Sequence, residues 1–166
     1  MRVIVVEDSF FTRLRLMTKI RSIVPGADVR CFALSSRALE FAKEHTVDVA
    51  FVEMELRPPQ MHGQDLVVWL QQINPQINLI FVAGTGDYAF FGWNIHISGY
   101  IRKNACKERI AKEFVNLRYP VPEQRNDRNA IIKAPLCANN RRRCISCVGL
   151  CSISFLLRRK KEHYQQ

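Results

Sequence analysis

The sequence predicts an α/β fold with a parallel, five-stranded sheet in the strand order 2-1-3-4-5. Short runs rich in β-branched residues alternate five times with stretches of helical spacing, within the first 120 of the 166 residues. Strands separated by single helices imply right-handed crossovers and a sheet covered on both faces. The expected architecture is therefore a three-layer (βα)5 sandwich of the flavodoxin-like type.

The first two strand-helix units are marked by apolar runs and by breaks between them. Strands are expected at residues 2–7 and 27–32, both short and β-branched. Helices are expected at residues 10–24 and 35–43, with Ser9 and then Ser35 or Ser36 as N-caps. Pro25-Gly26 ends the first helix. The apolar face expected to point inward on that helix consists of Phe11, Leu14, Leu16, Met17 and Ile20.

The remaining units follow the same pattern. Strands are expected at residues 47–52, 77–83 and 99–101, and a loop with two prolines and a glycine spans 54–63. Helices are expected at residues 64–73, at 87–97, which is rich in aromatic residues, and at 106–117. The inward residues are expected to be Leu66, Val67, Leu70, Ile73, Ile110, Phe114 and Leu117.

Acidic residues stand where two predicted strands end. Glu7 and Asp8 follow the first strand, and Glu53 follows the third. In the expected strand order these two strands are neighbours, so the three carboxylates meet at one edge of the sheet. Like charges this close need a cation, and Mg²⁺ takes oxygen ligands of this kind. Lys103, at the end of the fifth strand, can reach the same place.

Each of these acids taken alone is more simply explained as a solvated residue at the end of a strand. The pair Glu7-Asp8, the strand-end Glu53 and the strand-end Lys103 together favour a shared site. His45, His62 and His96 are scattered along the chain, which argues against catalysis by histidine.

Residues 3–9, 47–63, 77–89 and 98–104 resemble the CheY-like receiver domain of bacterial two-component response regulators. The resemblance covers residues 1–120 in order, and the stretch from Gly99 resembles receivers that precede a DNA-binding transcriptional-activator domain. Sporulation-type regulators share the same receiver fold. In this family a strand-three Asp accepts a phosphoryl group from a histidine kinase. The resemblance implies that Glu7, Asp8 and the acceptor position bind Mg²⁺, that Lys103 contacts the phosphoryl group, and that Tyr100 is the switch aromatic.

Three positions depart from the family pattern. The acceptor position holds Glu53, the strand-four Thr or Ser position holds Ala83, and Asn104 stands where a proline usually follows the lysine. Glu is longer than Asp by one methylene, which displaces its oxygens by about 1.5 Å in a reaction that depends on positioning. Ala83 cannot donate a hydrogen bond to a phosphoryl oxygen. We therefore expect phosphorylation at position 53 to be lost or weak, and Mg²⁺ binding to be weakened.

The tail, residues 121–166, is basic and contains most of the cysteines. It carries 10 Lys/Arg and 3 Asp/Glu, so it holds most of the net charge of +10. We expect it to be disordered or the remnant of an output domain. Its charge admits weak contact with nucleic acid phosphates, and its apolar segment between basic clusters admits binding at a membrane surface. A zinc site is also considered, although the spacing fits structural zinc poorly, at Cys137, Cys144, Cys147 and Cys151.

The predicted function is a non-enzymatic receiver module in phosphorelay signalling linked to transcription regulation, with atypical phosphoacceptance. A phosphorylatable, Mg²⁺-dependent receiver that controls a DNA-binding or sporulation-type output is the first alternative. An adaptor that binds metal or membrane through its tail is the second. Expected partners are a histidine kinase or another signalling protein, and a second copy of the chain across the face formed by residues 87–97, 99–101 and 106–117. No signal peptide or transmembrane segment is predicted, so a cytoplasmic location is expected.

Overall fold

The computed structural model describes residues 1–84 and 96–121. Its five parallel strands have the order β2-β1-β3-β4-β5, which confirms the predicted sheet. The strands are β1 (Arg2–Val6), β2 (Asp28–Phe32), β3 (Val49–Glu53), β4 (Asn78–Ala83) and β5 (Gly99–Arg102). The helices are α1 (Phe10–Ile23), α2 (Ser35–Glu44), α3 (Gly63–Ile73) and α4 (Lys107–Val115). The helix expected at residues 87–97 lies almost wholly outside the described residues, as do the predictions made for the tail.

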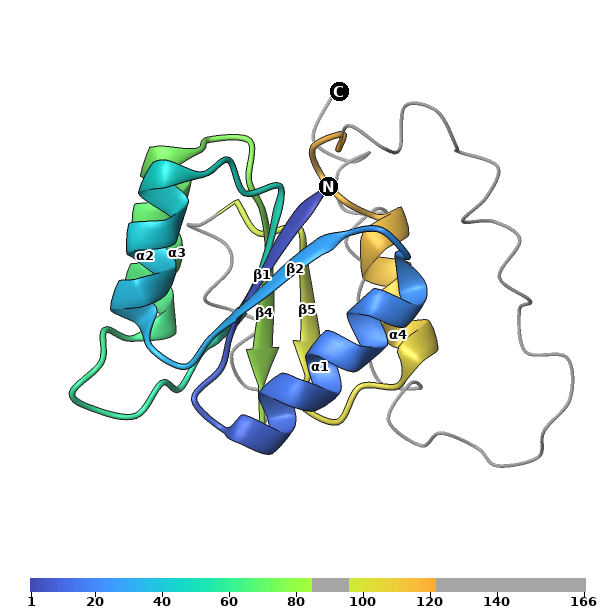
Figure 1. The fold of residues 1–166 in the computed structure, drawn as a ribbon, viewed down its shortest axis with the longest axis horizontal. Helices are drawn as coiled ribbons and strands as arrows, with labels where there is room; N and C mark the ends of the chain where they lie inside the picture. The colour runs from blue at the N-terminus through green and yellow to red at the C-terminus, as the bar shows by residue number, and fades with distance from the viewer. Residues whose placement is uncertain (85–95, 122–166) are drawn as a thin grey trace, which may run out of the picture. The chain divides into compact units, whose positions relative to one another are not determined.

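Helices cover both faces of the sheet, as the predicted three layers require. Figure 1 shows α1 and α4 on one side of the strands, and α2 and α3 on the other. Successive side chains of a strand point to opposite faces, so each strand contributes to two cores. In β1, Val3 and Val5 pack with the α1–α4 layer, whereas Ile4 and Val6 pack with the α2–α3 layer.

The strand register places the carboxyl ends of three strands side by side. Val6 of β1 pairs with Val52 of β3, so the residues that follow, Glu7 and Glu53, lie next to each other. On the other side of β3, Glu53 pairs with Val82 of β4. Ala83 then pairs with Arg102 of β5. The loops after β1, β3 and β5 therefore converge at one edge of the sheet, as the sequence predicts.

The inward face predicted for α1 is wrong at its start. Leu16 and Ile20 are buried, but Phe11 is 75% exposed and Leu14 is 43% exposed. At 3.6 residues per turn, Phe11 and Leu14 lie roughly 140–160° around the helix from Leu16. The helix therefore carries apolar residues on both sides, and only one side meets the sheet. Phe11 packs edge-to-face against Phe10, with the ring centroids 5.6 Å apart.

Two helix ends also differ from the prediction. The N-cap of α2 is Leu34, and Ser35 is the first helical residue, so neither Ser35 nor Ser36 is the cap. Ser9 is the N-cap of α1 as predicted, although its side chain makes no capping hydrogen bond. Ile73, predicted to point inward, is 37% exposed because it lies at the last turn of α3, beyond the part that covers the sheet.

Gly63 allows the first turn of α3 to lie directly against the end of β3. Its backbone N–H donates to the carbonyl of Met54 at 3.3 Å. A Cβ at this position would overlap the carbonyl oxygen of Glu53 and would lie 2.9 Å from the Cα of Met54. Only a glycine permits this approach, which holds the backbone of Glu53 in place. Within the described part of the chain, no helix is long and apolar enough to cross a membrane.

Candidate functional site

The two glutamates at the carboxyl edge of the sheet, Glu7 and Glu53, are completely buried. The loop backbone turns back onto each of them. The N–H of Ser9 donates to Oε1 of Glu7 at 3.0 Å, and the N–H of Glu55 donates to Oε1 of Glu53 at 3.1 Å. The loops after β1 and β3 therefore fix the direction of both carboxyl groups.

Lys103 supplies a positive charge to both glutamates. It follows β5, and its backbone N–H donates to the carbonyl of Ala83 at 3.0 Å, which ties it to the end of β4. Its ammonium group forms an ion pair with Oε2 of Glu53 and lies 3.6 Å from Oε1 of Glu7. The Lys103 side chain is 31% exposed, so the charge sits at the mouth of the site while its partners lie below it.

Burial and neighbouring charges shift the pKa values of Glu7 and Lys103. Burial raises the pKa of Glu7 to about 8, and the hydrogen bond and charge of neighbouring Glu53 act in the same direction, against the Ser9 N–H and Lys103. Burial and the neighbouring Glu53 therefore favour the protonated form of Glu7. Burial lowers the pKa of Lys103, but the bond to Glu53 and the negative charges outweigh it, so the pKa is raised and the ammonium stays charged. The result is an ion pair between Lys103 and Glu53 beside a Glu7 whose protonated form is favoured.

Asp8 lies beside these residues but has a different partner. Its Oδ2 accepts from Nε of Arg57 at 2.5 Å and from the backbone N–H of Arg57 at 3.3 Å. Burial acts to raise the pKa of Asp8, but the hydrogen bonds and charge of Arg57 outweigh it and hold the pKa below the usual value. This contact was not predicted from the sequence. A basic residue in the loop after the strand-three acid is the signal that could have suggested it.

The carboxylates of Glu7, Asp8 and Glu53 are oxygen donors of the kind that Mg²⁺ prefers. Their arrangement does not fit the ion, however, because side-chain cations already hold two of them. Lys103 pairs with Glu53, and Arg57 pairs with Asp8. Among residues 1–84 and 96–121, no group of three or more acidic, His or Cys side chains is arranged to hold a metal. The structure thus brings the predicted metal ligands together without forming a metal site.

The two predicted switch positions lie at the side of this cluster. Ala83 is fully buried at the end of β4, and its methyl group offers no hydrogen bond. Tyr100 is partly buried in β5 and packs against the α2–α3 core. The carbonyl of Tyr100 accepts from the guanidinium of Arg109 in α4 at 2.9 Å. Of the expected dimer face, β5 and α4 are described, and the helix expected before them lies outside the described residues.

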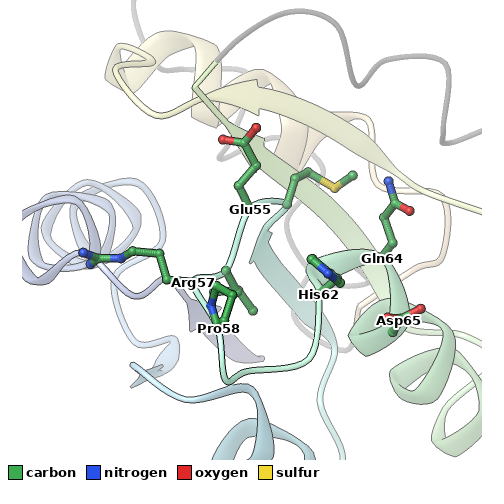
Figure 2. A pocket seen from close by; sticks show the side chains of 8 residues that line it. Glu55, Arg57, Pro58, His62, Gln64 and Asp65 are labelled. Carbon is green, nitrogen blue, oxygen red and sulfur yellow. The ribbon is translucent and has the colours of Figure 1, made fainter.

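The loop between β3 and α3 and the first turn of α3 line a hollow of about 510 Å³. Figure 2 shows Arg57 extending away from His62, Gln64 and Asp65, which lie across the hollow from it. Arg57 therefore belongs to the lining through its backbone and stem, whereas its guanidinium reaches Asp8. The lining residues are Met54, Glu55, Leu56, Arg57, Pro58, His62, Gln64 and Asp65.

The sequence of this chain matches a family model over the same residues that form the sheet. Residues 3–114 match the response regulator receiver domain. The chain belongs to the response regulator receiver domain family. Receiver domains act in two-component signalling, together with histidine kinases and output domains. The matched residues include Glu7, Asp8, Glu53 and Lys103.

A curated protein is similar to part of this chain. The transcriptional regulatory protein NatR of Bacillus subtilis (strain 168) is 26% identical over 80 residues, which are 48% of this chain and 34% of NatR. The chain thus spans about a third of the length of that relative.

Solved receiver domains share the fold. The N-terminal domain of a response regulator/sensory box/GGDEF protein from Carboxydothermus hydrogenoformans superposes with a TM-score of 0.62 at 20% identity, over 69% of this chain and 90% of that one. The chemotaxis protein CheY4 of Vibrio cholerae gives a TM-score of 0.62 at 18% identity, over 70% of this chain and 97% of CheY4. At this identity the likeness supports the receiver fold alone.

Proposed function

We propose that this receiver domain is non-enzymatic and does not depend on phosphorylation of position 53 for its working state. The supporting observation is the ion pair between Lys103 and the buried Glu53. In the family this lysine contacts a phosphoryl group on a strand-three Asp. Here the longer Glu53 reaches the ammonium itself, so the negative charge that phosphorylation would deliver is already next to Lys103.

The same ion pair opposes phosphoryl transfer. To attack phosphorus, a carboxylate oxygen of Glu53 has to leave Lys103 or the N–H of Glu55 and to approach in line with the leaving group. Both oxygens of Glu53 are engaged, and the carboxyl group is fully buried. At position 83 a methyl group stands where a hydroxyl would donate to the incoming phosphoryl group. Positioning therefore disfavours the reaction at each of its contacts.

We further propose that the output is carried by protein contacts in a pathway linked to transcription. The likeness to NatR supports this link, since that relative is a transcriptional regulatory protein. The partners we propose are a histidine kinase or another signalling protein, and a second copy of the chain across the face that includes β5 and α4.

The test is exposure of the full chain to acetyl phosphate and Mg²⁺, read by intact-protein mass spectrometry. The wild type is expected to gain no phosphoryl group, and Glu53→Asp is expected to gain a detectable amount, because Asp restores the acceptor length. Glu55→Asp, which shortens a nearby loop carboxylate outside the buried ion pair, is the matched control and should stay unmodified. A near-stoichiometric phosphoryl adduct on wild-type Glu53 would favour the alternative, a phosphorylatable Mg²⁺-dependent receiver.

A further inference from the structure

We propose that Arg57 is an internal counter-ion for Asp8 that competes with a divalent cation for this carboxylate. Both Nε and the backbone N–H of Arg57 donate to the same oxygen, Oδ2 of Asp8, at 2.5 and 3.3 Å. A metal ion bound through that oxygen would have to displace both donors. The loop after β3 thus supplies, from within the chain, the positive charge that an ion would bring.

The loop holds the backbone donor of Arg57 toward Asp8. Leu56, just before Arg57, is 2% exposed and packs in the α2–α3 core, which anchors the loop. Pro58, just after it, restricts the backbone of Arg57 to extended conformations. The N–H of Arg57 therefore points at Asp8 with little freedom to turn away. A contact built on a fixed N–H costs less conformational entropy than one made by a long side chain alone.

The two partners of this ion pair differ in how exposed their side chains are. The Asp8 side chain is 10% exposed, whereas that of Arg57 is 74% exposed. The carboxylate is therefore largely shielded from solvent, whereas the guanidinium can leave into solvent. Lys103 is engaged with Glu53, so it does not replace Arg57 when Arg57 leaves. Departure of the guanidinium would remove the side-chain donor from Oδ2 of Asp8 and leave this oxygen more accessible to an ion.

This inference is independent of phosphoryl transfer, because metal alone is the ligand. The experiment measures Mn²⁺, used in place of Mg²⁺, by electron paramagnetic resonance of the free ion with the full chain. Arg57→Ala is expected to bind Mn²⁺ up to about fivefold more tightly than the wild type, the factor that corresponds to an exposed ion pair worth about 1 kcal/mol. Arg57→Gln, which keeps the first three carbon positions of the side chain and a polar end group without the charge, should show the same direction.

Two further variants decide whether the effect is local. Arg37→Ala removes the same charge from the exposed pair of Arg37 with Glu40 on α2, and its affinity should equal that of the wild type. The gain in Mn²⁺ affinity caused by Arg57→Ala should disappear when Asp8→Asn is added to the same chain. Circular dichroism checks that each variant is folded. The proposal is overturned if both Arg57 variants bind Mn²⁺ no more tightly than the wild type. An equal gain in Arg37→Ala, or a gain that survives Asp8→Asn, also overturns it.

Discussion

The ammonium group of Lys103 is bonded to the carboxylate of Glu53 at the carboxyl edge of the sheet, where the Glu53 side chain is fully buried. This ion pair joins β3 to the end of β5. It is supported by the Glu55 N–H on the other oxygen of Glu53, and beside it burial raises the pKa of Glu7. The charge arrangement of the site is therefore complete within the chain.

The close approach of Gly63 to β3 predicts a specific sensitivity to one added methyl group. Gly63→Ala places a Cβ on the carbonyl oxygen of Glu53, so the end of β3 or the start of α3 must move. We expect a loss of about 1–3 kcal/mol in the free energy of unfolding, typical of overpacking. Urea unfolding followed by circular dichroism measures it.

Gly84→Ala is the matched control for Gly63→Ala. Among the residues that the structure describes, nothing lies within 4 Å of a Cβ at Gly84. Its substitution should therefore change the unfolding free energy by less than about 1 kcal/mol. Equal losses for the two alanine variants would show that the approach of Gly63 to Glu53 does not matter.

The exposed start of α1 predicts that its aromatic residues add little to stability. Phe11→Gln should change the free energy of unfolding by no more than about 0.5 kcal/mol, because Phe11 lies outside the core. Phe114→Ala, by contrast, should cost about 3–5 kcal/mol, since Phe114 is fully buried against Phe51. Thermal and urea unfolding of both variants decide the point, and a large loss for Phe11→Gln would place that ring in the core.

We expect the carboxyl group of Glu113 to make the free energy of unfolding depend on pH. Its carboxyl group is buried against Gly99 and pairs with Arg109, and burial outweighs Arg109 and raises its pKa above the usual 4.5. The folded state therefore binds a proton more tightly than the unfolded state. A carboxyl group of this kind stabilises less as pH rises from about 4.5 through its raised pKa.

Glu113→Gln should remove this dependence. Relative to the variant, the wild type is expected to lose stability as pH is raised across that window in urea unfolding. Glu44→Gln, at an exposed position on α2, is the control and should leave the pH profile of the wild type unchanged. A wild type that gains stability relative to Glu113→Gln over the same window would show that Arg109, and not burial, governs Glu113.

The sheet order and the acidic cluster could be predicted from the sequence because both depend on where strands end. Each strand is a short apolar run, and the order of five β/α units places the ends of β1 and β3 together. Glu7, Asp8 and Glu53 then follow from their places just after those runs. Lys103 could be assigned in the same way, because it directly follows β5.

The contacts made by each acid could not be predicted, because they depend on loop paths and on side-chain reach. Arg57 lies 49 residues from Asp8 and meets it only because the loop after β3 folds over the loop after β1. The prediction of which face of α1 points inward was wrong for another reason. Phe11 and Leu14 are as apolar as Leu16, so composition alone does not say which side of the helix is buried.

The most direct measurement is a double-mutant cycle between Lys103 and Glu53, using Lys103→Met, Glu53→Gln and the combined variant. Removing Lys103 alone leaves a buried charge without its partner, whereas the combined variant leaves none. The expected coupling in the free energy of unfolding is about 2 kcal/mol or more, with Lys43→Met, at an exposed position, as the control for loss of a lysine. A coupling of about 0.5 kcal/mol or less would show that Lys103 and Glu53 are independent, and would contradict a charge arrangement that is complete without phosphorylation.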